Sequence, residues 1–324
     1  MKKWMKTVAS MMVFTMAMTG CGGSGDSADD AANKYTVGIV QQLEHPALDA
    51  ASLGFQEKLT ELLDGNVTFD YQNAQGEQTN CTTIATKFVS DGVDLIMANA
   101  TTALQSAAAA TADIPIVGTS VTDYVTAGVA DSNEAPGRNV TGASDLAPID
   151  EQIAMLRELV PDAKKVGIVY CSAEPNSLYQ SKLAQAELDK ANIAWEEYTA
   201  ADSNEVQSVV TKAVSECDVL YIPTDNTMAN NTEIIKNVAV PAGVPVIAGE
   251  EGICSGCGVA TLSISYYDLG VKAAEMAYEI LVNGADPAEM PIEYVSEGIT
   301  EKYNAEIAEA LQIAIPEGMV AIGE

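Results

Sequence analysis

The sequence predicts an α/β protein made of two similar doubly wound parallel-sheet lobes, and three observations support this fold class. The chain has 324 residues, which is more than a single hydrophobic core usually supports. Short, continuously apolar segments alternate with longer segments of helical periodicity, as expected for parallel strands covered by helices on both faces. Three of the apolar segments recur in the same order in the second half of the chain, so both halves are expected to share one architecture.

The expected elements alternate between strand and helix through both halves. Strands are expected at 35–40, 67–72, 94–98, 114–118, 165–170, 194–198, 219–223 and 244–248. Helices are expected at 46–63, 77–90, 101–111, 176–191, 204–216 and 226–240. Val37–Val40 is repeated letter for letter as Val166–Val169. Segments 94–97 and 114–117 have counterparts at 218–221 and 244–247.

The order of the elements predicts interleaved lobes. A strand at 258–264 and a helix at 266–282 are expected to return to the first lobe, and 292–324 to the second. The first lobe is then 35–143 plus 264–291, and the second is 144–263 plus 292–324. Three crossings, near 142–146, 263–265 and 290–293, would form a hinge.

The first 34 residues are not expected to belong to the lobes. Lys2, Lys3 and Lys6 precede a short apolar stretch, which predicts a signal peptide over residues 1–20. This peptide ends in Met18-Thr19-Gly20-Cys21, a tetrad that resembles a bacterial lipobox and makes Cys21 the expected lipidation site. An ordinary signal peptide with an incidental Cys is the alternative. Residues 21–34 are rich in Gly, Ser, Asp and Ala and are expected to form a flexible tether. The expected location is extracytoplasmic, with a lipid anchor in the outer face of the bacterial cell membrane.

The composition disfavours several classes of function. The formal net charge of −30 disfavours a nucleic-acid partner and electrostatic docking on anionic lipid. The sequence shows no glycine-rich dinucleotide fingerprint, no phosphate-loop Lys and no nucleophile elbow, so neither an enzyme nor a cofactor is expected. His45 is the only His, so no catalytic or metal site is expected, although carboxylates alone could bind calcium. Cys254 and Cys257 form a lone CxxC pair, either a local disulfide or idle thiols, to which no chemistry is assigned.

Polar residues follow the expected strands of both lobes, where parallel sheets bind ligands. Two such sheets that face each other would leave a cleft between them. The candidate ligand-binding residues are Glu44, His45, Asn99, Thr101, Thr102, Ser120, Asn176, Ser177, Thr224, Asp225, Asn226 and Glu250.

Six segments resemble one family of solute-binding lipoproteins of ABC importers. They are Gln41–Asp49, Asn73–Gly76, Ala100–Gln105, Asn139–Gly142, Tyr170–Ser177 and Thr224–Thr227. The resemblance extends from Tyr35 to about Glu317. It implies the sugar-type (type I) periplasmic binding protein fold, and the best-understood members of the family bind tryptophan or related aromatic amino acids. It also implies a permease and an ATPase as partners, and a monomeric binding protein.

An amino-acid ligand would place specific demands on these residues. Its α-carboxylate would suit the helix starts at Thr101-Thr102 and Asn176-Ser177, although these residues could simply cap their helices. Its α-ammonium needs an acceptor, for which Asp225 is the first candidate and Glu250 and Glu44 are alternatives. Asp225 could equally be an N-cap. Tyrosines could line the site, but none is assigned as a stacking partner.

The leading hypothesis is an extracytoplasmic protein that binds an aromatic amino acid between its lobes and delivers it to a permease. The first alternative keeps the transport role and changes the cargo to a nucleoside, a sugar or another small solute. The mature chain would hold one Trp, Trp195, and three Phe, which disfavours a sugar site with an aromatic platform. A second alternative is a ligand-sensing receptor without transport.

Overall fold

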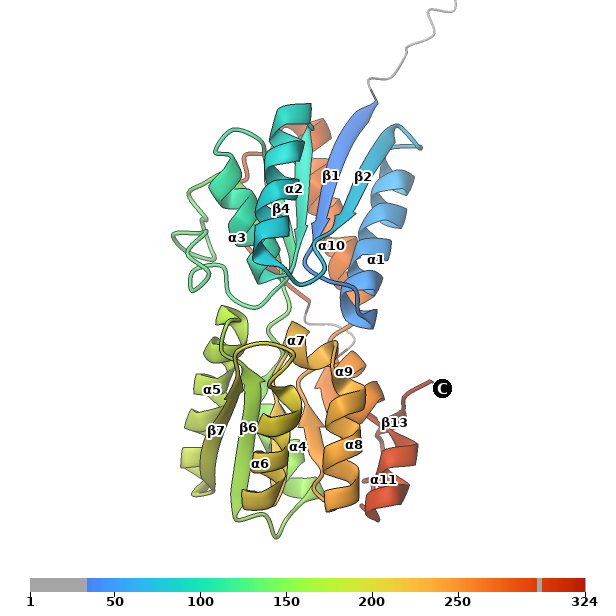
Figure 1. Cartoon of the computed structure of the whole chain (residues 1–324). Coiled ribbons are helices and arrows are strands. Elements are labelled where there is room, and N and C mark those ends of the chain that lie inside the picture. The colour runs from blue at the N-terminus through green and yellow to red at the C-terminus, as the bar shows by residue number, and fades with distance from the viewer. Residues whose placement is uncertain (1–33, 296–298, 324) are drawn as a thin grey trace, which may run out of the picture. The chain divides into compact units, whose positions relative to one another are not determined.

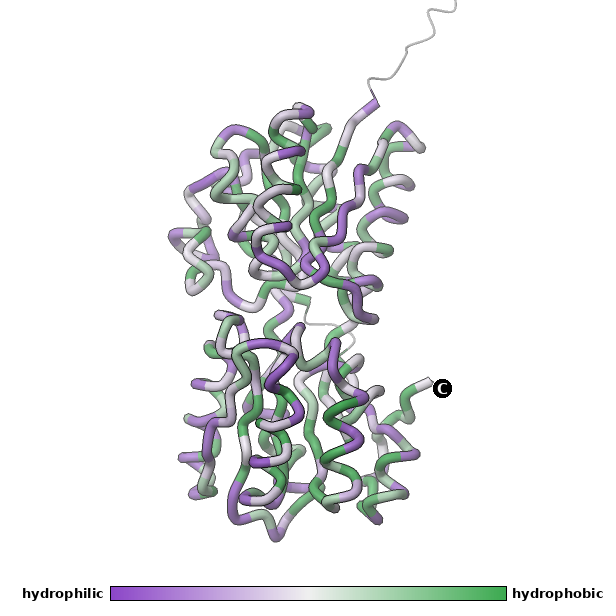
Figure 2. Tube along the Cα trace, in the orientation of Figure 1, coloured by the Kyte–Doolittle hydropathy of each residue, from purple (hydrophilic) through white to green (hydrophobic). Residues whose placement is uncertain are grey.

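The computed structural model describes residues 34–295 and 299–323, which contain two separate sheets (Figure 1). The expected signal peptide (1–20), Cys21 and nearly all of the expected tether (21–34) lie outside the described residues. Hydrophobic residues follow the strands, and hydrophilic residues concentrate in the loops and on the outer turns of the helices (Figure 2). Each sheet has a hydrophobic cluster on either face, as the continuously apolar strands predicted.

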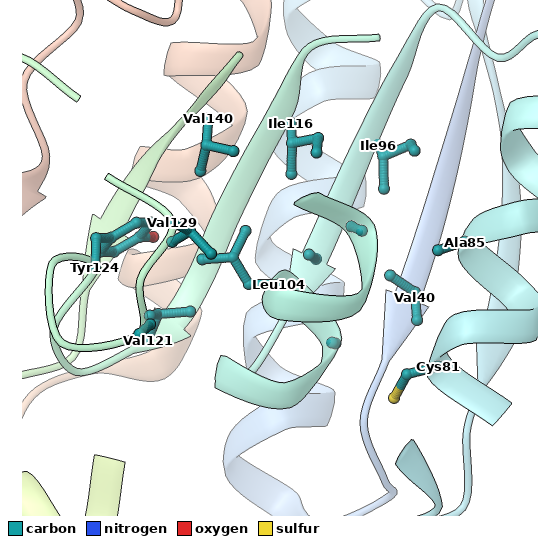
Figure 3. Packing of buried hydrophobic residues seen from close by; sticks show 14 of the residues in the cluster. Val40, Cys81, Ala85, Ile96, Leu104, Ile116, Val121, Tyr124, Val129 and Val140 are labelled. Atoms are coloured by element: carbon teal, nitrogen blue, oxygen red, sulfur yellow. The ribbon is translucent and has the colours of Figure 1, made fainter. Parts of the chain in front are cut away.

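In the described residues the first sheet has six parallel strands in the order β11-β5-β4-β3-β1-β2. The strands are β1 (Tyr35–Gln41), β2 (Val67–Asn73), β3 (Leu95–Asn99), β4 (Ile116–Val121), β5 (Val140–Ser144) and β11 (Glu293–Tyr294). Helices α1 (Pro46–Leu62) and α10 (Tyr266–Asn283) cover one face with Phe55, Leu59 and Ala273. Helices α2 (Gln78–Asp91) and α3 (Thr101–Ala110) cover the other face, where Leu104 packs against Ile116 and Val140 (Figure 3).

The second sheet repeats this plan in the order β13-β12-β10-β9-β8-β6-β7. The strands are β6 (Lys165–Cys171), β7 (Ala194–Ala200), β8 (Val219–Ile222), β9 (Val246–Ala248), β10 (Ala260–Ser263), β12 (Thr300–Tyr303) and β13 (Val320–Ala321). Helices α4 (Ile149–Leu159), α5 (Pro175–Ala191) and α11 (Ala305–Leu311) cover one face. Helices α6 (Val206–Glu216), α7 (Asn226–Ala229), α8 (Thr232–Ala242) and α9 (Glu251–Cys257) cover the other.

The internal repeat is visible in the strand order. The order β4-β3-β1-β2 in the first sheet corresponds to β9-β8-β6-β7 in the second. The repeated tetrapeptides Val37–Val40 and Val166–Val169 lie in β1 and β6, which hold equivalent positions. Strand β12 departs from the pattern because it runs antiparallel to β10. The predicted fold class, two similar parallel-sheet α/β lobes, is therefore confirmed.

Several local expectations differ from the structure. The helix expected over 226–240 is divided into α7 and α8, because the backbone leaves helical geometry at Asn231. Strand β5 and helices α4 and α9 were not anticipated, and α9 contains Cys254 and Cys257. The strand expected at 258–264 was placed in the first lobe, but β10 pairs with β9 and β12 in the second sheet, so only the helix after it returns to the first lobe. The chain was expected to leave the first lobe near 290–293. Instead β11 pairs with β5 at Glu293 and Tyr294, so Ile292–Tyr294 stay with the first sheet.

Candidate functional site

The carboxyl ends of the central strands carry most of the predicted site residues. Asn99 ends β3, Ser120 lies near the end of β4, and Thr224 follows β8. Ligands of parallel α/β sheets bind at this end of the strands, because the loops and helix N-termini converge there. Two side-chain hydrogen bonds join residues of the two lobes at this level. His45 Nε2 lies 3.1 Å from Asn226 Oδ1, and Gln180 Nε2 donates to Thr122 Oγ1 at 3.2 Å.

A cavity of about 680 Å³ opens beside these contacts. This volume lies within the range of small-molecule sites, roughly 300–1,000 Å³. Residues of both lobes line the cavity, and they include the predicted site residues Glu44 and Thr102. The wall residues from the first lobe are Gln42, Leu43, Glu44, Asn73, Gln75, Gly76, Glu77, Gln78, Thr102 and Gln105. Those from the second are Cys171, Ala173, Glu174, Pro175, Ala201, Asp202, Ser203, Asn204, Thr227 and Asn230.

Buried polar atoms without a hydrogen-bond partner gather at the same strand ends. Among the described residues, the unpaired atoms of predicted site residues are His45 Nδ1, Asn99 Oδ1, Ser120 Oγ, Asn176 Oδ1 and Thr224 Oγ1. Gln42 Oε1 and Thr119 Oγ1, from residues that were not predicted, share this property and location. A buried polar group left unpaired costs about 1–3 kcal/mol. Atoms of this kind that converge from both lobes are suited to a polar ligand that would pair with them.

Helix α3 presents its first backbone N–H groups without a side-chain cap. Its N-cap is Ala100, whose backbone angles are φ 86° and ψ 158°, in a region that only Gly adopts readily. Thr101 therefore opens the helix and does not cap it. The N-terminus of α5 is similar, because its N-cap Glu174 makes no side-chain capping bond and Asn176 and Ser177 follow inside the helix. The structure thus corrects the capping role considered for these residues. Uncapped helix N-termini favour anionic groups such as a carboxylate.

Two predicted acidic residues are caps. Asp225 Oδ1 accepts from Met228 N at the start of α7, and Asp225 Oδ2 accepts from Cys171 N. Burial, aided by the nearby Glu174 carboxylate, raises the pKa of Asp225 to about 8. Glu250 caps α9 by accepting from Gly252 N and Ile253 N, and burial raises its pKa too, against the lowering effect of His45 and those two N–H groups. Because both carboxylates already accept two backbone N–H groups, the first candidate for an ammonium acceptor has a structural role.

The remaining predicted residues differ in exposure. Glu44 is exposed at the cavity wall, and Thr102 is half-buried there. Thr101 and Ser177 are buried, and Ser177 Oγ donates to Thr224 O at 3.4 Å. Asn226 is buried and links the lobes through His45. The structure thus brings ten of these side chains into the buried level of the strand ends and leaves Glu44 and Thr102 nearer the solvent.

Sequence reasoning missed several polar residues at this level. Glu174 accepts hydrogen bonds from Asn176, Asn226 and Thr227, and so organises the loops of the second lobe. Asp145 is buried and accepts from Thr122 Oγ1 at 2.8 Å and from Tyr266 Oη at 3.0 Å. Thr119 and Gln180 complete the set. Thr119 directly follows the strand expected at 114–118, so its position could have indicated it. Asp145 follows β5, a strand that was not expected, so no such signal was available for it.

The other candidate chemistries receive no support from the described residues. Cys254 and Cys257 are free and buried in the core of the second lobe, where burial raises the pKa of each thiol. Over 34–295 and 299–323, no cluster of His, Cys, Asp and Glu has the arrangement needed to hold a metal ion. In the same ranges, no helix combines the length and hydropathy needed to cross a membrane.

Comparison with known proteins supplies the family. Residues 36–323 match the family model described as "ABC transporter substrate binding protein". A tyrosine-binding protein of Clostridioides difficile is 38% identical over 306 residues, which are 91% of this chain and 88% of the relative. The structure also matches an ABC domain from Streptococcus pneumoniae in complex with L-Trp. That match has a TM-score of 0.85 and 32% identity, and it covers 89% of this chain and 100% of the other.

Two further structures define the range of likeness. The ligand-free, open structure of a substrate-binding protein with adhesive properties from Clostridium difficile gives a TM-score of 0.69 at 37% identity, covering 89% of this chain and 99% of the other. A myo-inositol-bound ABC transporter solute-binding protein from Bacillus halodurans gives 0.62 at 17% identity, covering the same shares, which shows the fold alone. With nearly the whole described chain inside the family model, the protein belongs to the family of ABC transporter substrate-binding proteins.

Proposed function

We propose that this protein binds an aromatic amino acid in the cleft between its lobes and delivers it to the permease and ATPase of an ABC importer. Two relatives support the ligand class: one is named as a tyrosine-binding protein, and the other was solved with L-Trp. The observation that carries the proposal is the group of unpaired buried polar atoms contributed by both lobes. These atoms are expected to pair with the α-carboxylate and α-ammonium groups.

Different parts of the site are suited to different groups of the ligand. The uncapped start of α3 and the hydroxyls of Thr119 and Ser120 are suited to the α-carboxylate. The cavity offers space for the side chain, and Leu43, Ala173, Pro175 and Ala201 are apolar residues of its wall. The described structure has a higher TM-score with the tryptophan complex than with the open relative, although the open relative is more similar in sequence. This difference supports a lobe arrangement that grips a ligand.

Closure requires a hinge, and we propose the three crossings between the sheets for it. They follow β5, β10 and β11. We place the lobes at residues 35–145 plus 264–295 and residues 146–263 plus 299–323, because Asp145 bonds to Val121, Thr122 and Tyr266 of the first lobe. The family works outside the cytoplasm, and for this chain we propose an N-terminal lipid anchor at Cys21, supported by the lipobox-like tetrad and the tether after it. A Cys21→Ser variant is expected to leave the membrane fraction of cells that produce it. We further propose that one copy of the chain is sufficient for binding.

Titration calorimetry of the purified protein against the twenty amino acids tests the ligand class. Tyrosine, tryptophan or phenylalanine is expected to bind with a one-to-one ratio, and charged amino acids are expected to give no heat. A nucleoside and a monosaccharide are titrated in parallel. Binding of either, with no response to any amino acid, would contradict the proposed ligand and retain the transport role.

A further inference from the structure

The buried level of the cleft contains four carboxylates whose roles differ. They belong to Asp145, Glu174, Asp225 and Glu250, each at most 3% exposed. None of them takes part in an ion pair within the described part of the chain. A buried anion is costly unless a cation or several hydrogen bonds compensate it. If the ligand is an amino acid, as proposed above, its ammonium group can provide that compensation.

Three of the four carboxylates accept hydrogen bonds from fixed backbone donors. Glu174 receives two backbone N–H bonds, two side-chain amide bonds and one hydroxyl bond. Glu250 receives two backbone N–H bonds at the start of α9, and Asp225 receives one at the start of α7 and one from Cys171 at the end of β6. These backbone donors cannot turn away, so the three groups are held by the fold without a ligand.

Asp145 lacks such donors. Its two hydrogen bonds come from the hydroxyls of Thr122 and Tyr266, which are neutral groups that can rotate. Burial raises the pKa of Asp145, whereas these hydroxyls and its own backbone N–H lower it. Among the four, Asp145 is therefore the carboxylate that no backbone N–H of another described residue holds in place.

The surroundings of Asp145 place it at the ligand level. Its backbone N–H donates to Val121 O, beside Ser120, whose hydroxyl is unpaired. Thr122 Oγ1, which donates to Asp145, accepts from Gln180 Nε2 of the second lobe. Gln180 in turn donates to Thr224 O, and Thr224 Oγ1 is another unpaired atom. Asp145 is therefore hydrogen-bonded to Thr122, which forms one of the contacts between the lobes. It also lies close to unpaired buried polar atoms of the proposed ligand site.

We propose that Asp145 is the acceptor of the ligand's α-ammonium group and that Tyr266 is a positioning residue for its carboxylate. The ligand class is then a free amino acid with an unmodified amino group. An N-acylated amino acid has no positive charge on its nitrogen, so it cannot form an ion pair with the carboxylate of Asp145. Because Thr122 joins Asp145 to Gln180, the same carboxylate also connects ammonium recognition to lobe closure.

The test compares Asp145→Asn with the wild-type protein by calorimetry, using the aromatic amino acid that the wild type binds best and its N-acetyl derivative. Asn can still accept from Thr122 and can donate to Tyr266, so the fold is expected to survive. Asp145→Asn should weaken binding of the amino acid at least tenfold. The N-acetyl derivative should bind the variant at least as tightly as it binds the wild type. Asp113→Asn, an exposed carboxylate of the same lobe, is the matched control.

The pH dependence distinguishes ammonium binding from a structural role. Affinity of the wild type should increase as the pH rises through the pKa of Asp145, which burial places above the ordinary Asp range, because Asp145 must ionise to bind the cation. Asp145→Asn should lose this contribution, while Asp225 and Glu250 titrate in both proteins and Tyr124 and Tyr266 stay neutral. An affinity within threefold of wild type for Asp145→Asn, or an unchanged pH profile, would overturn the inference. Failure of the wild type to bind any amino acid would refute the proposed function instead.

Discussion

At the scale of single residues, the site depends on positions that are unfavourable for folding. Ala100 and Ser120 have positive φ at the ends of adjacent strands β3 and β4, and both are buried. Strain of this kind costs about 1–3 kcal/mol and persists where the surrounding structure enforces it. At Ala100 the strain turns the chain directly from β3 into α3, so that the helix start faces the ligand level without a side-chain cap.

Replacing Ala100 by Gly should therefore cost less stability than the same change at an ordinary position. Ala107, equally buried within α3, is the matched control because both changes remove a buried methyl group and add backbone freedom. We expect Ala107→Gly to lower the free energy of unfolding by about 1–2 kcal/mol. Because Ala100→Gly also relieves the backbone strain, its free energy of unfolding should be higher than that of Ala107→Gly by about 1–3 kcal/mol. Denaturant unfolding measures both, and equal losses would show that Ala100 is unstrained.

At the scale of elements, α10 is the helix with which the chain returns from the second lobe to the first. It packs on α1 through two glycines, Gly54 and Gly270. A Cβ at Gly270 would collide with the carbonyl oxygen of Ala51, and a Cβ at Gly54 with that of Tyr267. The two backbones therefore approach more closely than any larger residue would allow, and this contact fixes the start of α10, where Tyr266 reaches Asp145.

Gly270→Ala should separate the two helices. Overpacking of this kind typically costs about 1–3 kcal/mol, and we expect that loss in the free energy of unfolding. Because the shift also displaces Tyr266, ligand affinity should fall more than for a control on the same helix. Val282→Ala, at an exposed position, is that control and should change stability by less than about 0.5 kcal/mol. Stability of Gly270→Ala equal to that control would contradict the close packing.

The sequence predicts elements better than it predicts the site, for a physical reason. Continuous apolar strands and the repeated tetrapeptides carry the parallel sheets, since burial on both faces leaves a local signature. The importance of Asp145 depends on β5 and α10, which are far apart in the sequence and meet only through the fold. Likewise, Asp225 has the same sequence context whether it caps α7 or contacts a ligand, and only its hydrogen bonds reveal the cap.

At the scale of the whole molecule, ligand binding depends on contacts that join the lobes. The side chains of His45 and Asn226 meet across the cleft, and Thr122 and Gln180 form a second contact. If the open form predominates without ligand, each such contact increases the fraction of the protein that is competent to hold the ligand. The apparent affinity scales with that fraction, even where a side chain never touches the ligand.

A double-mutant cycle on ligand affinity isolates the His45–Asn226 contact. His45→Ala and Asn226→Ala each remove one partner, and the double variant removes both, so the cycle cancels effects that each side chain has on the ligand or its own lobe. Because a net hydrogen bond contributes about 0.5–1.5 kcal/mol, the coupling should be roughly two- to tenfold in affinity. The Lys236–Glu306 ion pair, exposed within the second lobe, provides a control cycle with no expected coupling to affinity. Additive effects at His45 and Asn226 would mean that this contact does not hold the ligand-bound form together, and closure would then depend on Thr122 and Gln180.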